Sequence, residues 1–134
     1  MNIKIKATKY PCTRATKTSA GYDLRCLHPF ALDKNEIVSI STGVYLDIPE
    51  DVVAMVCPRS GLAVKHGITV LNAPGIIDSD YKDEVKVILT KVTPYEVMFK
   101  EGERIAQLVF TKWLASDDVV ETERDGGLGS TGTK

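Results

Sequence analysis

The sequence has few of the residues that build disulfide frameworks or metal centres. Its 134 residues include only 3 cysteines and 2 histidines. Cys12, Cys26 and Cys57 are odd in number and widely spaced, which argues against both a disulfide framework and a zinc site. His28 and His66 are isolated and have no metal-ligand spacing to any cysteine. We therefore expect free thiols that are mostly packed, and histidines that lie at the surface or form hydrogen bonds.

Long apolar runs and an excess of one charge are also missing. No segment approaches the roughly 20 apolar residues that span a bilayer, and the N-terminus lacks the continuous apolar core of a signal peptide. The formal net charge of -1 provides no broad basic field, so stable nucleic-acid binding is not expected. These absences predict a soluble intracellular protein with no membrane partner, located in the cytoplasm, or in the nucleus or a host cell if the source is eukaryotic or viral.

What the sequence does have is a series of short β-type segments separated by turn residues. With 43% hydrophobic and 26% charged residues, the chain fits one globular domain. We predict strands at residues 3–7, 22–27, 30–32, 37–41, 44–48, 52–57, 68–71, 75–77, 85–90, 97–99 and 104–110. The apolar run 52–57 is expected to be buried on both faces. This pattern predicts an all-β sandwich or jelly roll.

One helix and one tail complete the prediction. The helix covers residues 60–66, with Ser60 as its N-terminal cap and Gly67 in the left-handed conformation that ends it. From about Glu121 the chain is rich in glycine and nearly lacks large apolar side chains, so it cannot pack a core. We therefore divide the chain into a folded domain, 1–120, and a C-terminal tail, 121–134, that is mobile in the free protein.

An acidic turn in the middle of the chain is the first candidate for chemistry. Gly75, Ile76 and Ile77 read as a strand that ends at Asp78, within the sequence Gly-Ile-Ile-Asp-Ser-Asp-Tyr. A carboxylate at a strand end, with apolar residues behind it, can act as a general base on water. An ordinary turn with solvated acids explains the same local composition.

Two other segments suit phosphate oxygens. Arg59, Ser60 and Gly61 join an apolar strand to the start of the helix, where backbone amides, a hydroxyl and a guanidinium could bind phosphate. A capped helix with a surface arginine is the simpler interpretation. Arg104 and Gln107 interrupt an otherwise apolar strand, so that Gln107 could bind phosphate while acids hold Arg104, or Arg104 could form only a structural salt bridge.

The remaining candidates lie near the two ends of the chain. Asp23 follows a tight turn and offers one carboxylate, which suits a magnesium ion that takes most of its ligands from triphosphate and water. A simple Asx turn is the alternative. The tail sequence Gly-Gly-Leu-Gly-Ser-Thr-Gly offers unobstructed backbone amides and hydroxyls that could wrap a polyphosphate, although a flexible linker has the same composition.

The order of these segments is more specific than any one of them. AGYDL, PRSGLA, GIIDSDY, RIAQLVF and GGLGSTG follow one another between residues 20 and 132. This series closely resembles the five ordered motifs of the trimeric dUTPase family, the deoxyuridine triphosphate nucleotidohydrolases. The resemblance implies a jelly-roll homotrimer whose active sites are shared between subunits. It also implies hydrolysis of dUTP to dUMP and pyrophosphate by a water that attacks the α-phosphorus, with Mg²⁺ as cofactor.

The resemblance also implies a role for each motif. Asp78 corresponds to the base that activates the water, and Asp23 to the carboxylate that holds the metal. The implied phosphate ligands are Arg59, Ser60, Gly61 and Gln107. Uracil would be bound by Asn72, the backbone of Gly75, Ile76 and Ile77, and the strand near Lys86, and the deoxyribose would pack on Tyr81. The implied tail contacts are Arg124, Leu128, Gly129, Ser130 and Thr131.

Three positions depart from the family pattern. Leu128 stands where the family has a phenylalanine that stacks on uracil, which weakens that contact by about 1 kcal/mol. Arg124 is one residue closer to the glycine pair than in the family, a departure that affects its implied contact with the γ-phosphate. Asp83 replaces a glycine that usually follows the tyrosine-containing turn, so the hairpin there can differ.

Two other functions remain open on the sequence. The dCTP deaminase branch of the same fold, with its bifunctional members, shares the Arg-Ser helix start, but it places a catalytic glutamate in the strand that here reads 85–90 and contains no carboxylate. A trimeric nucleotide sensor or protein-binding regulator without catalysis would use the same scaffold. Loss of the base would be typical of such a regulator, and Asp78 is intact.

Overall fold

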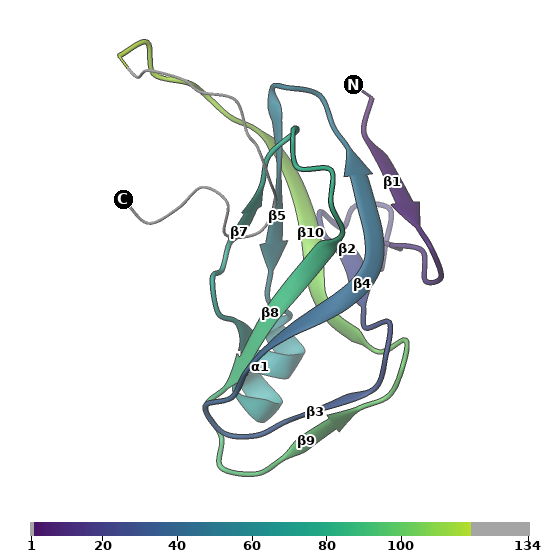
Figure 1. Cartoon of the computed structure of the whole chain (residues 1–134), viewed down its shortest axis with the longest axis vertical. Helices are drawn as coiled ribbons and strands as arrows, with labels where there is room; N and C mark the ends of the chain where they lie inside the picture. Colours follow the sequence, from purple (N-terminus) through teal and green to yellow (C-terminus); the bar gives the residue numbers. More distant parts are fainter. Residues whose placement is uncertain (1, 119–134) are drawn as a thin grey trace.

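The computed structural model describes residues 2–118 and is built from short strands with one helix (Figure 1). The prediction of a mostly β fold with one short helix is confirmed. In chain order the elements are β1 (Lys4–Ala7), β2 (Tyr22–Arg25), β3 (Phe30–Leu32), β4 (Ile37–Asp47), β5 (Val52–Cys57), α1 (Ser60–His66), β6 (Ile68–Val70), β7 (Gly75–Ile77), β8 (Val85–Lys91), β9 (Val97–Phe99) and β10 (Arg104–Lys112). The tail and its implied site residues, Arg124, Leu128, Gly129, Ser130 and Thr131, lie outside the described residues.

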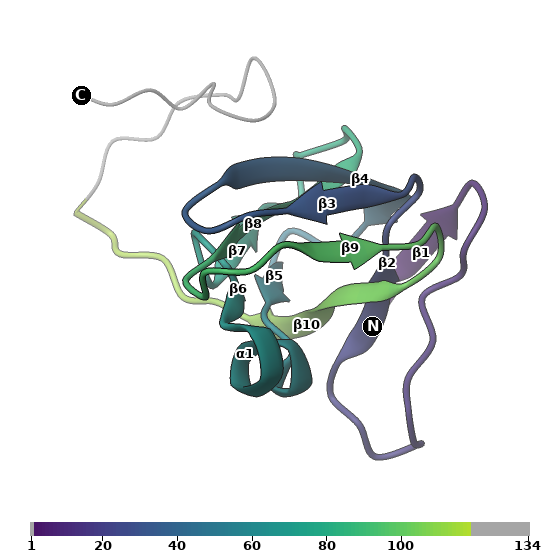
Figure 2. The same ribbon diagram turned by 90° about the horizontal axis from the view of Figure 1, so that it is seen from below.

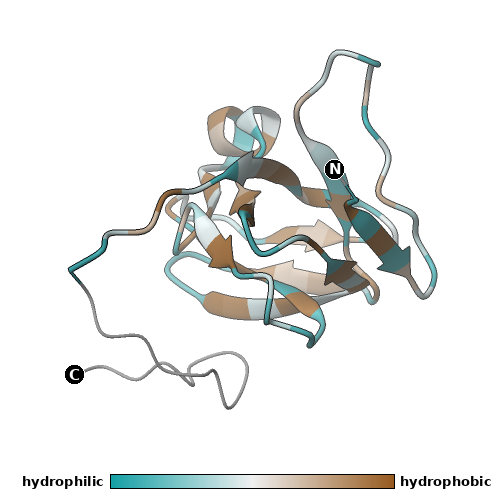
Figure 3. Ribbon diagram, turned by 90° about the horizontal axis from the view of Figure 1, so that it is seen from above, coloured by the Kyte–Doolittle hydropathy of each residue, from teal (hydrophilic) through white to brown (hydrophobic). Residues whose placement is uncertain are grey.

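Two four-stranded sheets enclose one hydrophobic core. The first has the order β1-β4-β8-β6 and the second β2-β10-β5-β7, and the short pair β3-β9 forms a third sheet. All pairings are antiparallel. Figure 2 shows β3 and β9 side by side and α1 outside the sheets. Apolar residues follow the strands, whereas most of the connecting loops are hydrophilic (Figure 3).

The core forms because alternate residues of the strands point to the same side. Val85, Val87 and Leu89 of β8 are almost fully buried, and so are Val52, Ala54 and Val56 of β5. The other residues of β5 are only half-buried in the single chain. The prediction that β5 is buried on both faces is therefore wrong for the subunit. A continuous apolar run does not distinguish a core face from an apolar outer face.

Strand β4 is longer than the sequence predicts. We expected two strands separated by Thr42 and Gly43, but one 11-residue strand runs through both positions. The pairing of β4 with β8 shifts register between Ser41 and Val44. Gly43 adopts a φ of 69°, and the buried Thr42 hydroxyl donates to the Val85 carbonyl at 2.5 Å. A β-bulge thus absorbs the two residues that look like a turn.

The helix ends partly as predicted. Gly67 ends α1 in the left-handed conformation, with a φ of 62°. At the other end, Arg59 is the N-cap residue and no side chain caps the helix, so the predicted cap at Ser60 is wrong. Ser60 is the first helical residue and its hydroxyl is exposed. Its side chain is therefore not committed to capping the helix start.

The three cysteines are free thiols, as predicted. Cys12, Cys26 and Cys57 are all free; Cys26 is buried and the other two are partly buried. Within residues 2–118 no helix is long and apolar enough to cross a membrane.

The bulge in β4 predicts a specific intolerance at Gly43. A Cβ added there would lie 2.3 Å from the Thr8 hydroxyl oxygen, in a backbone conformation that side chains rarely adopt. We expect Gly43→Ala to lower the free energy of unfolding by about 2 kcal/mol, since strain and overlap add. Urea denaturation measures this change. An unchanged midpoint would show that β4 relaxes at no cost.

Candidate active site

A bulge in β10 brings two polar side chains to the same face of the second sheet. Ile105 and Ala106 are both buried, and the register with β2 shifts between Arg104 and Ala106. In a regular strand Arg104 and Gln107 would point to opposite faces, because they are an odd number of residues apart. The bulge re-aims one of them, so that both side chains avoid the core. The sequence places the two residues on one strand but contains no clear sign of this bulge.

Gln107 lies on the middle strand of three, and its side chain fits in a narrow space that we call the Gln107 slot. It pairs with Asp23 of β2 on one side and with Cys57 of β5 on the other. Its amide nitrogen donates to the Pro58 carbonyl at 3.0 Å. A Cβ added at Gly21 would lie 1.9 Å from the Gln107 amide oxygen. The glycine of AGYDL therefore gives the Gln107 amide its room.

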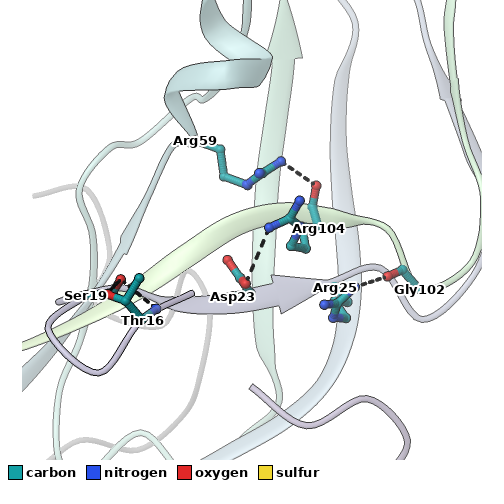
Figure 4. A network of polar contacts seen from close by, with 7 residues as sticks. All are labelled: Thr16, Ser19, Asp23, Arg25, Arg59, Gly102 and Arg104. Atoms are coloured by element: carbon teal, nitrogen blue, oxygen red, sulfur yellow. Dashed lines mark hydrogen bonds and ion pairs between the residues drawn. The ribbon is translucent and has the colours of Figure 1, made fainter. Parts of the chain in front are cut away.

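Asp23 and two arginines form a polar cluster beside this slot (Figure 4). Arg104 Nη1 lies 3.8 Å from the Asp23 carboxylate, whose side chain is only 16% exposed. Arg59, the residue before α1, donates to the Arg104 carbonyl in a long hydrogen bond of 3.5 Å. Arg104 is thus paired with an acid, as both readings of the sequence predict. The cluster has two cations and one carboxylate, which leaves it suited to anions.

The start of α1 presents open space next to this cluster. Ser60 and Gly61 are both exposed. No atom lies within 4 Å of a Cβ built at Gly61. Packing inside the subunit therefore does not require a glycine at residue 61. The helix has only seven residues, so a bound anion would depend on the local amides, the Ser60 hydroxyl and Arg59 rather than on a long helix dipole.

The donor set around Asp23 limits what metal could bind. Among residues 2–118 there is no group of three or more His, Cys, Asp or Glu side chains that could hold a metal ion. One carboxylate suits Mg²⁺, which keeps several waters and takes further oxygens from substrate phosphates. It does not suit Zn²⁺, which needs three or four protein ligands. Asp23 therefore fits a magnesium ion that arrives with a triphosphate.

Cys12 is a neighbour of Asp23 that the sequence does not single out for the site. The Asp23 amide donates to the Thr13 carbonyl at 2.8 Å, which brings the loop before β2 against this strand. Burial, together with the nearby Asp23 carboxylate, raises the pKa of the Cys12 thiol to about 11. Cys12 is therefore a protonated thiol at neutral pH and a poor nucleophile.

The strand β7 forms the second part of the candidate site. It pairs with β5 through Gly75, Ile76 and Ile77 and lies at the edge of its sheet. In the part of the chain that the structure describes, no strand pairs with its outer edge. Asn72 folds back over the strand, with its amide nitrogen 3.3 Å from a Cβ built at Gly75. An open edge of backbone donors and acceptors can bind the edge of a planar base.

Asp78 and Tyr81 follow the other end of β7. Asp78 is exposed, and its carbonyl accepts from the Tyr81 amide at 3.1 Å. The Tyr81 hydroxyl donates to the Glu84 carbonyl at 2.8 Å. The ring is partly buried and packs against the hydrophobic core. A tight turn therefore fixes Tyr81 close in sequence and space to Asp78.

Within one chain, the polar cluster around Gln107 lies apart from the end of β7 that precedes Asp78 and Tyr81. Ile77 pairs with Ala54, whereas Gln107 pairs with Cys57, three residues further along β5. At about 3.3 Å per residue and about 4.8 Å between strands, Ile77 and Gln107 are on the order of 14 Å apart. Lys86 is exposed on β8 in the opposite sheet, paired with Ser41. The structure thus brings Asp23, Arg59 and Gln107 together, and places Asp78 and Tyr81 elsewhere.

Comparison with known proteins agrees with the order of the motifs. The dUTPase family model matches residues 8–132. The chain is 45% identical over 127 residues to the deoxyuridine 5'-triphosphate nucleotidohydrolase of Hydrogenobaculum sp., covering 90% of this chain and 88% of that protein. It is 46% identical over 126 residues to the enzyme of the same name from Rickettsia canadensis, covering 88% of this chain and 85% of that protein.

A solved structure extends the comparison to three dimensions. The crystal structure of dUTPase from Streptococcus mutans superposes with a TM-score of 0.77 at 27% identity, covering 87% of this chain and 99% of that chain. The similarity therefore covers the whole fold. With the family model matched along almost the entire sequence, the chain belongs to the dUTPase family.

Proposed function

We propose that this protein is a dUTP diphosphatase, which hydrolyses dUTP to dUMP and pyrophosphate. The observation that carries the proposal is the cluster of Asp23, Arg59 and Gln107, in a chain that belongs to the dUTPase family. Relatives with 45% identity are named deoxyuridine 5'-triphosphate nucleotidohydrolase. The chemistry of a triphosphate needs positioning and charge neutralisation more than covalent catalysis, and this cluster offers both.

The phosphate chain binds across Gln107, Arg59, Ser60 and Gly61. Gln107 is held in its slot by the Pro58 carbonyl, and the Arg59 guanidinium lies nearby with only a long contact to Arg104. The Ser60 hydroxyl is exposed and does not cap the helix. These donors can therefore turn to phosphate oxygens with little loss of internal hydrogen bonds. Gly61 leaves room for the phosphate to approach the backbone.

Asp23 would hold the magnesium ion that accompanies the triphosphate, and the ion would supply charge neutralisation at the phosphate oxygens. Asp23 is mostly enclosed, and Arg104 holds its carboxylate from one side. Together, Arg104 and Arg59 add positive charge next to the position of the phosphates, which lowers the cost of gathering a triphosphate in one place.

Uracil binds along the open edge of β7. The backbone groups from Gly75 to Ile77, with the Asn72 amide, meet the two carbonyls and the N3 proton of uracil, and Lys86 lies on the strand that returns from this hairpin. Cytosine has the opposite donor and acceptor pattern at N3 and C4, so it would leave buried polar groups unpaired. Backbone contact also leaves little room for the thymine methyl group.

Tyr81 and Asp78 act on the sugar and the water. The hydrogen bond to Glu84 fixes the Tyr81 ring. In this position the ring packs under a deoxyribose and would collide with the 2′-hydroxyl of a ribose. Asp78 accepts a proton from a water molecule and directs that water at the α-phosphorus. A carboxylate so placed favours hydrolysis over transfer to another acceptor, because water is the nucleophile that it holds.

A homotrimer with shared active sites completes this arrangement. Asp78 and the phosphate ligands are separated in one chain, since the pairing of β7 and β10 with β5 sets their distance. A neighbouring subunit can supply the missing group to each site. The half-buried outer face of β5 is apolar and is suited to an interface between subunits.

The C-terminal tail covers the nucleotide in this proposal. In this role Leu128 contacts the uracil ring, Gly129, Ser130 and Thr131 bind the phosphates through backbone amides and hydroxyls, and Arg124 binds the γ-phosphate. Asp83 stands in the turn after Tyr81 and sets the shape of the hairpin there.

The dCTP deaminase alternative has less support. That branch needs a catalytic glutamate in the strand corresponding to β8, whose seven residues, Val-Lys-Val-Ile-Leu-Thr-Lys, include no carboxylate. A regulator without catalysis would not require Asp78. The two alternatives differ from the proposal in product, because a deaminase releases ammonia and a pure regulator releases nothing.

Replacing Asp78, the proposed general base, distinguishes the dUTP diphosphatase from the deaminase and from the regulator. We expect wild-type protein to release pyrophosphate from dUTP alone among the common dNTPs, and Asp78→Asn to lower kcat by about 10²-fold or more, since a general base contributes that much. Asp33→Asn makes the same change in an exposed turn between β3 and β4 and should keep full activity. Near-normal turnover by Asp78→Asn would contradict the role of Asp78, and ammonia release from dCTP would contradict the proposed activity.

A second prediction tests the Gln107 slot. Gly21→Ala displaces the Gln107 amide, because the new Cβ would overlap its oxygen at 1.9 Å. The displaced atom is the end of a flexible side chain, so we expect little change in the thermal midpoint and about a tenfold rise in KM for dUTP. In a Gln107→Ala background the same substitution should have little further effect. Additive effects of the two substitutions would show that Gly21 acts independently of Gln107.

A further inference from the structure

Within residues 2–118, helix α1 packs a single residue, Leu62, against the hydrophobic core. None of its residues is buried. Leu62 and His66 are only partly buried, and Val64 is 84% exposed. A short helix normally depends on the packing of an apolar face, because its own hydrogen bonds are marginal in water. The position of α1 therefore depends on contacts at its two ends.

The contacts at the first end come from β10. The Gln107 amide donates to the Pro58 carbonyl at 3.0 Å, and Arg59 reaches the Arg104 carbonyl at 3.5 Å. Both contacts precede the helix, and both involve residues that we assign to phosphate binding. When a nucleotide binds, these donors can turn from the two carbonyls to phosphate oxygens. The contacts at the other end of the helix must then keep α1 in place.

The contacts at the second end come from the loop between β8 and β9. The Thr93 hydroxyl donates to the His66 carbonyl at 2.5 Å, and the Tyr95 hydroxyl donates to the Lys65 carbonyl at 2.9 Å. The Val92 amide donates to the Gly67 carbonyl at 3.0 Å. Three carbonyls at the end of the helix, which have no partner within it, are thus bound by one loop.

Lys91 organises this loop from inside the protein. It is the largest fully buried side chain in the described part of the chain, with an exposure of 0%. Its amino group donates to the Thr93 carbonyl at 2.6 Å and to the Thr93 hydroxyl at 3.0 Å. It also lies 4.7 Å from the centre of the Tyr95 ring. None of the salt bridges found in residues 2–118 includes Lys91.

A buried amino group in these surroundings has a definite effect. It requires acceptors, since an unpaired buried charge is costly, and its nearest acceptors belong to Thr93. It therefore draws Thr93 into the conformation in which the hydroxyl faces the helix. Its charge also lies near the negative end of α1 and over an aromatic face, and both are favourable for a cation.

We propose that Lys91, Thr93 and Tyr95 form a clasp that positions α1, and with it Ser60 and Gly61, for the phosphates of the substrate. The proposal rests on the assignment of Ser60 and Gly61 as phosphate ligands under the proposed function. The three residues are positioning residues, because they act through the helix and do not touch the nucleotide. Uracil binding uses β7 and Asn72, and no hydrogen bond within residues 2–118 joins these to Lys91, Thr93 or Tyr95.

The clasp predicts a difference between two ligands. A loosened α1 weakens the binding of a triphosphate but leaves the binding of a nucleoside unchanged, because deoxyuridine carries no phosphate. General destabilisation of the protein would reduce both. The ratio of the two affinities therefore separates positioning from stability. The probes are deoxyuridine and an α,β-imido analogue of dUTP that resists hydrolysis.

Thr93 offers a matched pair of variants. Thr93→Val keeps the shape and removes the hydroxyl, whereas Thr93→Ser keeps the hydroxyl. We expect Thr93→Val to raise the Kd of the imido analogue about 2- to 12-fold, as expected for one hydrogen bond, and to leave the Kd of deoxyuridine within twofold. Thr93→Ser should resemble wild type. Amides of α1 should exchange hydrogen faster in Thr93→Val, and amides of β5 should not.

The outcomes that overturn the clasp differ from those that overturn the activity. Equal effects of Thr93→Val on both ligands, no effect on either, or unchanged exchange in α1 would each reject the clasp. Failure of wild type to hydrolyse dUTP would reject the proposed function, whatever the variants do. Tyr95→Phe, which removes the hydroxyl that donates to the Lys65 carbonyl and lies 3.3 Å from His66 Nδ1, provides a second test if Thr93→Val folds poorly. It too should raise the Kd of the imido analogue and leave that of deoxyuridine within twofold.

Discussion

The pairing of β10 with two strands at once determines most of what this protein can do. β10 lies between β2 and β5, so its residues are fixed from both sides. At Gln107 the partners are Asp23 and Cys57, which brings residues from three distant parts of the sequence into one row. Interior strands of a sheet hold their backbone more rigidly than loops do, and a phosphate site built on them needs little reorganisation.

The same sheet also keeps part of the site incomplete. Because β7 pairs with β5 on the side away from β10, the strand that carries Asp78 is separated from the strand that carries Gln107 by the full width of β5. No side-chain rotation closes a gap of that size. Under the proposed function, a second copy of the chain brings the general base to the phosphate ligands.

Polar contacts hold the helix outside this sheet in place. α1 buries none of its residues and is held at its ends by β10 and by the loop after β8. The buried Lys91 has carbonyl, hydroxyl and aromatic partners. Polar contacts of this kind are directional, so they fix orientation as well as position.

The sequence by itself determined the mostly β fold with one short helix, the family and the order of the motifs. Those features depend on local properties: the alternation of side chains, the punctuation by glycine and proline, and residue types in order. It did not determine the continuity of β4, the half-exposed outer face of β5, the uncapped start of α1, or the common direction of Arg104 and Gln107. Each of these depends on which strand lies alongside, because a bulge or an exposed face exists only relative to a partner. The role of Lys91 is of the same kind, since a lysine at the end of an apolar strand looks like a surface residue until the loop after it folds back over the helix. Tertiary structure decided these features because pairing and burial are properties of residues that are far apart in the sequence.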